Sequence, residues 1–302
     1  MRKVKAQERG IQPVKLKLGL PIGSLQKATL EILAAAGFEV YPAERSYFPH
    51  IDDEEIEPRL VRPQDMPRFV EKGVLDAGIT GQDWVAENGS RVHTVADLIY
   101  AKHRWTPVRW VLAVSRKSGI TKPEQLAGRR VATELVNVTK SYFRKKGIKA
   151  EVEFSHGATE GKVPDIVDAI VDVTETGETL RANDLAIIDT VLNSTTQLIA
   201  NKEAWKDDWK RSKIEGLRIL IEGAIAAHDM VGLKMNVSKS KLDAVIAKLP
   251  ALRAPTISTL ANEAGFALEI IVKEKLARTL IPDLKRAGAE GIVEYPLNKL
   301  IP

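Results

Sequence analysis

The sequence contains no cysteine, only 5% aromatic residues and no hydrophobic run of membrane-spanning length. Without cysteine there are no disulfides, no thiolate catalysis and no cysteine-ligated metals. The basic first residues, 1–13, lack the apolar segment of a signal peptide. We therefore expect a cytoplasmic protein that does not engage a membrane.

Neither sign of charge dominates, because 45 Lys and Arg residues are interspersed with 40 Asp and Glu residues for a net charge of +5. A nucleic-acid-binding protein usually shows a basic stripe with aromatic residues between its charges. The most basic segment, "YFRKKGIK" at 142–149, is typical of a solvated helix end that stops at Gly147. The five histidines show no metal-ligand spacing. These features favour an anionic small-molecule ligand over nucleic acid.

The length of 302 residues predicts two or three domains. Alternating strand and helix patterns before residue 230 indicate an α/β fold with parallel sheets covered on both faces. In the first helix, an apolar stripe is predicted from Leu25, Ala28, Ile32 and Ala35. The predicted domains are a first lobe (1–105 and 191–229), a second lobe (106–190) and a C-terminal domain (230–302).

The predicted C-terminal domain has the order strand, helix, strand, strand, helix, strand, which is typical of a ferredoxin-like fold. Its sequence contains no obvious reactive group of side chains. We therefore expect a regulatory or assembly role for it.

One segment of the second lobe, "DAIVDVTETGETLRAN", carries a chemical signal. Side chains alternate along a strand, so Asp168 and Asp172 are predicted on one face. The strand leads into a turn at the sheet edge where ligands of open α/β sheets bind. There the glycine lets backbone N–H groups approach an anion, and Thr176 and Thr179 add hydroxyl donors. The pattern predicts a ribose 5-phosphate, with its phosphate on the turn and its hydroxyls on the acids.

The alternative interpretation is an ordinary strand-to-helix turn with a hydroxyl cap. A Gly-Thr turn alone does not separate the two interpretations. The two acids immediately before the turn favour the phosphate site.

Several segments together resemble the ATP phosphoribosyltransferase family. The quoted segment matches that family's phosphoribosyl-pyrophosphate loop, and four more stretches agree in order and spacing: "LGLPIGSLQKATLEIL", "RPQDMPRFVEKGVLDAGITGQDWV", "RRVATELVNVTKSYFRKKG" and "STTQLIAN". Residues 249–260 and the later "LIPDLKRAGAEGI" resemble the regulatory domain of the family's long form. The similarity covers nearly the whole chain from about Val14.

The resemblance implies a two-lobed core like that of type II periplasmic binding proteins, followed by a ferredoxin-like (ACT-like) domain. It implies transfer of the phosphoribosyl group from phosphoribosyl pyrophosphate to N1 of ATP with release of pyrophosphate, the first step of histidine biosynthesis. It also implies Mg²⁺ as cofactor, feedback inhibition by histidine, and a homo-hexamer that forms dimers at low effector concentration.

The same resemblance implies site residues. The ribose hydroxyls would lie on Asp168 and Asp172 with Glu160 nearby, and these three are the expected catalytic residues. The implied substrate-binding residues are Thr174, Glu175, Thr176, Gly177, Glu178, Thr179 and Leu180 in the turn, and Pro21, Gly23, Ser24, Leu25, Arg62, Thr80, Gly81 and Asp83 in the first lobe. The implied histidine-binding residues are Asn236, Leu252 and Thr256.

The sequence departs from the family around Gly23, where Ile22 and Ser24 stand in places that often carry Lys and Arg. The candidates to replace these two cations near the triphosphate are Lys15, Arg45 and Arg62.

Other functions of the same fold remain as alternatives. A solute-binding protein has two such lobes without catalysis, but is normally exported. A transcription regulator needs a helix-turn-helix, for which there is no room before the first strand. A family member that has lost catalysis is disfavoured by the retained "TETGETL".

Overall fold

The structure is a computed structural model, and it describes residues 14–41, 46–101, 105–250, 255–261 and 264–301. The chain forms two compact units. One unit comprises the residues up to Ala34 together with Phe38–Arg218, and the other comprises Ala35–Gly37 together with the chain from Ile219. Among the described residues, no helix combines the length and apolar character needed to cross a membrane.

The first lobe is built on a five-stranded sheet with the order β4-β1-β5-β12-β6. Strand β1 pairs in parallel with β4 and β5, whereas β12 is antiparallel to its neighbours β5 and β6. A small hairpin of β2 and β3 accompanies it. The strands are β1 (Leu16–Pro21), β2 (Val40–Tyr41), β3 (His50–Ile51), β4 (Ile56–Val61), β5 (Ala77–Gly81), β6 (His93–Leu98) and β12 (Thr196–Ala200), and the helices are α1 (Gln26–Ala36), α2 (Met66–Glu71) and α3 (Gln82–Asn88).

The buried stripe of α1 differs from the predicted one. The helix buries Thr29, Ile32, Leu33 and Ala36, whereas Leu25, Ala28 and Ala35 of the predicted stripe are only partly buried. Thr29 is tolerated inside because its hydroxyl donates to the backbone oxygen of Leu25 at 2.8 Å and bonds the Tyr100 hydroxyl at 2.8 Å. A buried polar group with partners avoids the desolvation penalty that an unpaired one would carry.

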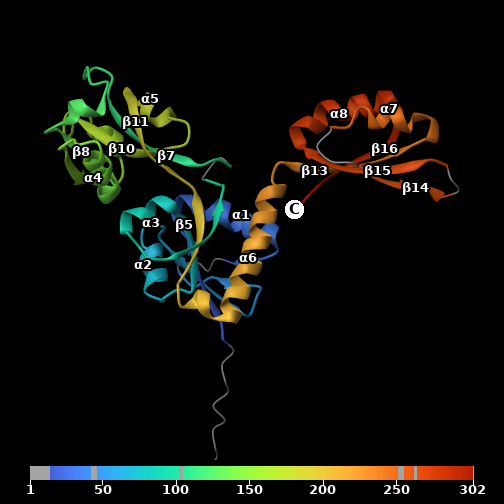
Figure 1. Cartoon of the computed structure of the whole chain (residues 1–302), viewed down its shortest axis with the longest axis horizontal. Coiled ribbons are helices and arrows are strands. Elements are labelled where there is room, and N and C mark those ends of the chain that lie inside the picture. The colour runs from blue at the N-terminus through green and yellow to red at the C-terminus, as the bar shows by residue number, and fades with distance from the viewer. Residues whose placement is uncertain (1–13, 42–45, 102–104, 251–254, 262–263, 302) are drawn as a thin grey trace, which may run out of the picture. The chain divides into compact units, whose positions relative to one another are not determined.

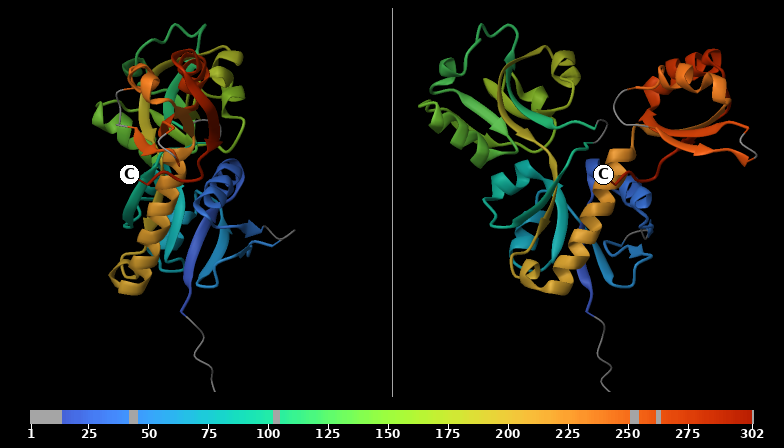
Figure 2. Two further views of the ribbon diagram at one scale, coloured as in Figure 1. Left: turned by 90° about the vertical axis from the view of Figure 1, so that its right-hand side faces the viewer. Right: turned by 45° about the vertical axis from the view of Figure 1, so that its right-hand side comes forward.

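The second lobe is a five-stranded sheet with the order β11-β7-β10-β8-β9. Strands β10, β8 and β9 are parallel, but β7 runs antiparallel to both β10 and β11, so the expected all-parallel sheet is wrong in both lobes. The reversed strands are the two by which the chain enters one lobe from the other, β7 after β6 and β12 after β11 (Figure 2). The elements are β7 (Val108–Ser115), β8 (Arg130–Thr133), α4 (Val136–Lys145), β9 (Glu151–Phe154), β10 (Ala169–Thr174), α5 (Glu178–Ala182) and β11 (Leu185–Ser194).

Strand β11 runs to Ser194, past the expected lobe boundary at residue 190, and β12 of the first sheet begins at Thr196. The return from the second lobe to the first therefore falls at Thr195.

The C-terminal domain follows α6 (Asp208–Ala227) and confirms the ferredoxin-like order. Its antiparallel sheet has the order β14-β15-β13-β16, and α7 and α8 cover one face of it (Figure 1). The buried face of β13 alternates along Val231, Leu233, Met235 and Val237, as the pleat of a half-covered strand requires. The elements are β13 (Met230–Val237), α7 (Leu242–Ile246), β14 (Thr256–Thr259), β15 (Phe266–Lys273), α8 (Glu274–Ala287) and β16 (Ala289–Pro296).

Candidate functional site

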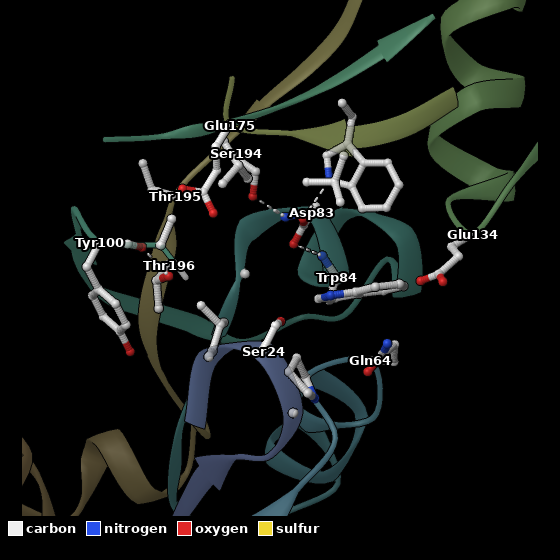
Figure 3. A pocket seen from close by; sticks show the side chains of 18 of the residues that line it. Ser24, Gln64, Asp83, Trp84, Tyr100, Glu134, Glu175, Ser194, Thr195 and Thr196 are labelled. Carbon is white, nitrogen blue, oxygen red and sulfur yellow. Dashed lines mark hydrogen bonds between the residues drawn. The ribbon is translucent and has the colours of Figure 1, made fainter. Parts of the chain in front are cut away.

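A cavity of about 620 Å³ lies in the first unit, where the ends of strands from both lobes meet (Figure 3). This volume is in the range of small-molecule sites. Eight of the residues expected from the sequence line it: Gly23, Ser24, Leu25, Arg62, Gly81, Asp83, Thr174 and Glu175.

Asp83 is the most buried carboxyl group of the cavity. It lies in the first turn of α3 with 5% of its surface exposed. Its Oδ2 accepts a hydrogen bond from the indole N–H of Trp110 at 2.6 Å, and its backbone N–H donates to Ser194 Oγ at 3.1 Å. Burial raises the pKa of Asp83, and the hydrogen bonds that it accepts offset only part of this rise. Because Trp110 belongs to β7, this buried carboxylate joins the first lobe to the second.

Gly81 is required by the position of that carboxylate. A Cβ at residue 81 would lie 2.0 Å from Asp83 Oδ1, a distance that no real contact allows. The "GITGQD" motif therefore has a steric explanation, because any side chain at residue 81 would displace Asp83.

Three aromatic side chains line the cavity. The rings of Trp84 and Trp110 meet edge to face, with 6.2 Å between their centroids, and Tyr100 lies on the opposite side from Trp84 (Figure 3). Burial raises the pKa of Tyr100, so its hydroxyl stays protonated. The sequence interpretation missed all three, although Trp84 directly follows Asp83 in the "GQDWV" segment.

Three carboxylates gather beside the turn at 174–180. The pKa of Asp172 is raised to about 6, first by burial and then by the negative charges of Glu160 and Glu134. Glu134, which the sequence interpretation missed, lies just before α4 and also lines the cavity. The acid group formed by Glu134, Glu160 and Asp172 thus extends from the turn to the cavity wall. Within the described ranges there is no cluster of three or more His, Asp or Glu side chains placed to hold a metal ion.

Asp168 is not brought to the cavity. It precedes β10, and its two oxygens accept hydrogen bonds from the Arg129 guanidinium at 2.9 Å and the Arg130 backbone N–H at 3.0 Å. At roughly 3.3 Å per strand residue, it lies about 13 Å along the strand from Asp172. The two aspartates therefore share a strand face but lie at different ends of the strand, and the Asp168 carboxylate is hydrogen-bonded to Arg129 and Arg130.

The expected phosphate turn adopts a closed conformation. Gly177 has φ +76°, which favours glycine, and its N–H donates to Thr174 Oγ1 at 2.7 Å. The N–H of Glu178 donates to Thr176 Oγ1 at 3.2 Å, so these two amides bond within the turn and do not point at an anion. The Thr176 hydroxyl keeps its own hydrogen for donation, and the next N–H groups of α5 have no partner inside the helix.

Two other side chains of α5 bear on the expected phosphate site, because one is buried in the core and the other carries a positive charge. Leu180 is 2% exposed and packs in the core of the second lobe, so its side chain supports the turn from beneath. Arg181, which the sequence interpretation omitted, donates from Nη1 to the Thr176 backbone oxygen at 3.0 Å and places a cation beside the turn. Thr179 and Glu178 are exposed on the same helix.

The remaining expected residues support or lie apart from the cavity. Pro21 and Thr80 are buried at the ends of β1 and β5, where Thr80 Oγ1 donates to the Pro63 backbone oxygen at 2.8 Å. Of the three candidate cations, Arg62 lines the cavity, Lys15 is exposed before β1, and Arg45 lies outside the described residues.

The expected histidine-binding residues fall in the C-terminal domain. Asn236 of β13 and Thr256 of β14 are both exposed, and their pairing with Ala267 and Glu269 of β15 puts them on one sheet face. Leu268 and Ile270, which alternate with these partners, are buried, so this face is the one without helices. Leu252 lies outside the described residues.

Fold and cavity together define a two-lobed α/β core of the periplasmic-binding-protein type, joined to a ferredoxin-like domain. Residues 62–223 match the family model described as ATP phosphoribosyltransferase, and residues 227–299 match the one described as HisG, C-terminal domain. The chain belongs to the ATP phosphoribosyltransferase family, and it is a transferase of the first step of histidine biosynthesis.

Curated relatives and a solved structure agree with this assignment. The chain is 57% identical over 286 residues to the ATP phosphoribosyltransferase of Chlorobaculum parvum, which covers 95% of this chain and 97% of that protein. Identity to the enzyme of Pelotomaculum thermopropionicum is 54% over 289 residues, covering 96% of this chain and 100% of the relative. A solved structure of the ATP phosphoribosyl transferase (HisG:HisZ) complex from Thermotoga maritima has a TM-score of 0.59 at 30% identity, covering 68% of this chain and 98% of that chain.

Proposed function

We propose that the reaction takes place where the acid group meets the cavity. The adenine of ATP lies in the aromatic part of the cavity, and phosphoribosyl pyrophosphate lies over the turn at 174–180. The observation that carries this proposal is that one cavity is lined both by the rings of Trp84 and Trp110 and by the polar side chains of Glu134, Thr174 and Glu175. Flat apolar rings suit a purine base, and carboxylates suit sugar hydroxyls.

In the reaction, the bond from N1 of adenine to C1 of the ribose forms while the bond from C1 to pyrophosphate breaks. The N1 lone pair is available without deprotonation, so no general base is required. Positive charge develops on the sugar in an oxocarbenium-like transition state, and negative charge develops on the leaving group. The negative charges of Asp172, Glu160 and Glu134 stabilise the former, because fixed charges aimed at developing charge are effective in a partly desolvated site.

The phosphate groups are bound by donors from both lobes. The 5-phosphate accepts hydrogen bonds from the Thr176 and Thr179 hydroxyls and from the α5 amides that follow Glu178, with Arg181 supplying positive charge nearby. On the other side, Arg62 takes the place of the cations that Ile22 and Ser24 do not supply. Binding both anionic substrates in one cavity supplies much of the rate by orientation.

Mg²⁺ fits this donor set as a metal that arrives with the substrate. The described residues contain no all-protein cage, but Mg²⁺ usually keeps several waters and binds one or two carboxylates together with substrate phosphates. Asp172 and Glu160 are the carboxylates that would hold it. When bound, it neutralises charge on the leaving pyrophosphate.

Regulation and assembly are proposed for the C-terminal domain. Its uncovered sheet face carries Asn236 and Thr256, and we assign histidine inhibition and hexamer formation to this domain. That the protein works in the cytoplasm remains a prediction.

The test uses a variant that removes one charge from the acid group. The full chain is incubated with ATP, phosphoribosyl pyrophosphate, Mg²⁺ and a pyrophosphatase, and the ultraviolet change of N1-ribosylated adenine is followed. We expect Glu134→Gln to lower kcat about tenfold. The matched control is Glu151→Gln, an exposed position of the same lobe, which should keep wild-type kcat. If Glu134→Gln and Glu151→Gln had the same kcat, Glu134 would have no role at the reacting centre.

A further inference from the structure

Helix α4 of the second lobe begins without a cap of its own. Its N-cap residue is Leu135, which has no side-chain oxygen, and the helix starts at Val136. The first N–H groups of an α-helix have no partner inside the helix, and a Ser, Thr, Asp or Asn side chain usually accepts from them. The segment "TELVNVTK" has none of these residues at that position.

The missing cap is supplied by Glu87 of the first lobe. Its Oε1 accepts from the Asn137 N–H and its Oε2 from the Val138 N–H, both at 3.0 Å. In the opposite direction, Asn137 Nδ2 donates to the Glu87 backbone oxygen at 3.0 Å. A carboxylate is favoured at this helix end because the macrodipole makes it positive. A side chain of one lobe therefore completes a helix of the other.

The helix that carries Glu87 is held from both sides. Trp84 of α3 packs against the core cluster of the second lobe, which includes Trp110 and Leu135. Asn88, at the end of α3, donates from Nδ2 to the Gln64 backbone oxygen of the first lobe at 2.9 Å. Helix α3 thus connects the first lobe to the start of α4.

Glu134 of the acid group directly precedes the capped turn. We propose that Glu87 is a positioning residue: by capping α4 across the lobes, it fixes the segment at 133–138 and holds Glu134 against the reacting sugar. The acid group is then complete only while the two lobes keep this contact. This inference rests on the proposed function, because it takes the role of Glu134 from there.

The experiment compares Glu87→Ala with Glu71→Ala in the full chain. Glu71 is a matched control, because its Oε1 also accepts from a backbone N–H, that of Arg91 at 3.0 Å, but within the first lobe. We expect Glu87→Ala to lower kcat about tenfold with both KM values changed by less than about twofold, since misplacing a catalytic group affects the chemical step. Glu71→Ala should keep wild-type kcat. Hydrogen exchange should become faster at the amides of Asn137 and Val138 only in Glu87→Ala.

Two further variants separate this inference from the proposed function. In Glu87→Gln, one amide oxygen still accepts, so part of the lost kcat should return. In the double variant Glu87→Ala/Glu134→Gln, kcat should be no lower than in Glu134→Gln alone, because residues that act as a unit are not additive. Multiplied losses, or a wild-type kcat in Glu87→Ala while Glu134→Gln is impaired, overturn the positioning role and leave the proposed function intact. A wild-type kcat in Glu134→Gln overturns both.

Discussion

The two ends of strand β10 carry the same residue type on the same face, but their surroundings differ. Before the strand, Asp168 accepts hydrogen bonds from Arg130 and Arg129 that outweigh its burial and hold its pKa below the usual range. Inside the strand, Asp172 lies near two other acids, and burial with their charges raises its pKa to about 6. One aspartate is neutralised by a neighbouring cation, whereas the other keeps a charge that a substrate can use.

This difference shows that the strand face on which a carboxylate lies does not by itself predict whether the carboxylate binds a ligand. A paired carboxylate contributes to the folded state, while a carboxylate placed among like charges is unfavourable until a cation or a hydrogen-bond donor arrives. Perturbed acids of the second kind are the better candidates for a functional site.

The largest effect is expected from removing the charge of Asp172. Asp172→Asn should lower kcat/KM for phosphoribosyl pyrophosphate about a hundredfold, because it removes a charge that stabilises the transition state. Asp168→Asn should stay within about threefold of wild type, because its partners lie in the second-lobe sheet and not at the cavity. Steady-state kinetics on both variants measure the ratio. An equal loss of kcat/KM in the two variants would show that Asp168 and Asp172 both act in the reaction.

Much of the fold and part of the site follow from local sequence. The turn around Gly177, the "GITGQD" approach to Asp83 and the ferredoxin-like strand order depend on short-range spacing, which a single sequence displays. The physical signals of these motifs are a positive φ, a close backbone approach and alternating burial. The eight expected residues that line the cavity were implied by the family resemblance.

The rest depends on pairing across long sequence separations. Asp83 finds Trp110 and Ser194 only because extended segments cross between the lobes, and no periodicity in the sequence reports that crossing. In the same way, the cation that pairs with Asp168 comes from the segment before β8, far from it in the sequence. Glu134 carries no motif of its own and becomes visible only beside Asp172.

The second largest effect concerns pH. The raised pKa of Asp172, about 6, means that its carboxylate takes up a proton as the pH falls through that value and loses the charge that helps the reaction. We expect kcat/KM to fall by about tenfold per pH unit well below this pKa. The profile of Asp172→Asn should lack this limb, whereas that of Asp168→Asn should keep it. A limb that persists in Asp172→Asn would belong to another group.

A smaller effect is expected in the turn that follows β10. Thr176→Val combined with Thr179→Val should raise the KM for phosphoribosyl pyrophosphate about thirtyfold, because each of the two lost hydroxyl donors is worth roughly 1 kcal/mol. The KM for ATP should not change. Thr121→Val, at an exposed position of the same lobe, controls for a general effect of losing a hydroxyl. An unchanged KM in the double variant would contradict the assignment of the phosphate to this turn.

The smallest effect is on stability, and it has opposite signs at the two ends of β10. The folded-state pKa of Asp172 is raised, so its favourable contribution is present below the ordinary value of 3.8 and is lost as the pH rises through about 6. At pH 7.5 Asp172→Asn should therefore unfold at a higher temperature than wild type.

The pKa of Asp168 is lowered, so its contribution is present above the ordinary value and is lost on acidification. At pH 7.5 Asp168→Asn should unfold at a lower temperature, by roughly 2–4 °C for about 1 kcal/mol. Thermal scans at pH 7.5 and pH 4 test the comparison. The difference between the two variants should shrink at the lower pH, because the wild-type Asp172 is protonated there, while Asp168 with its lowered pKa keeps its charge.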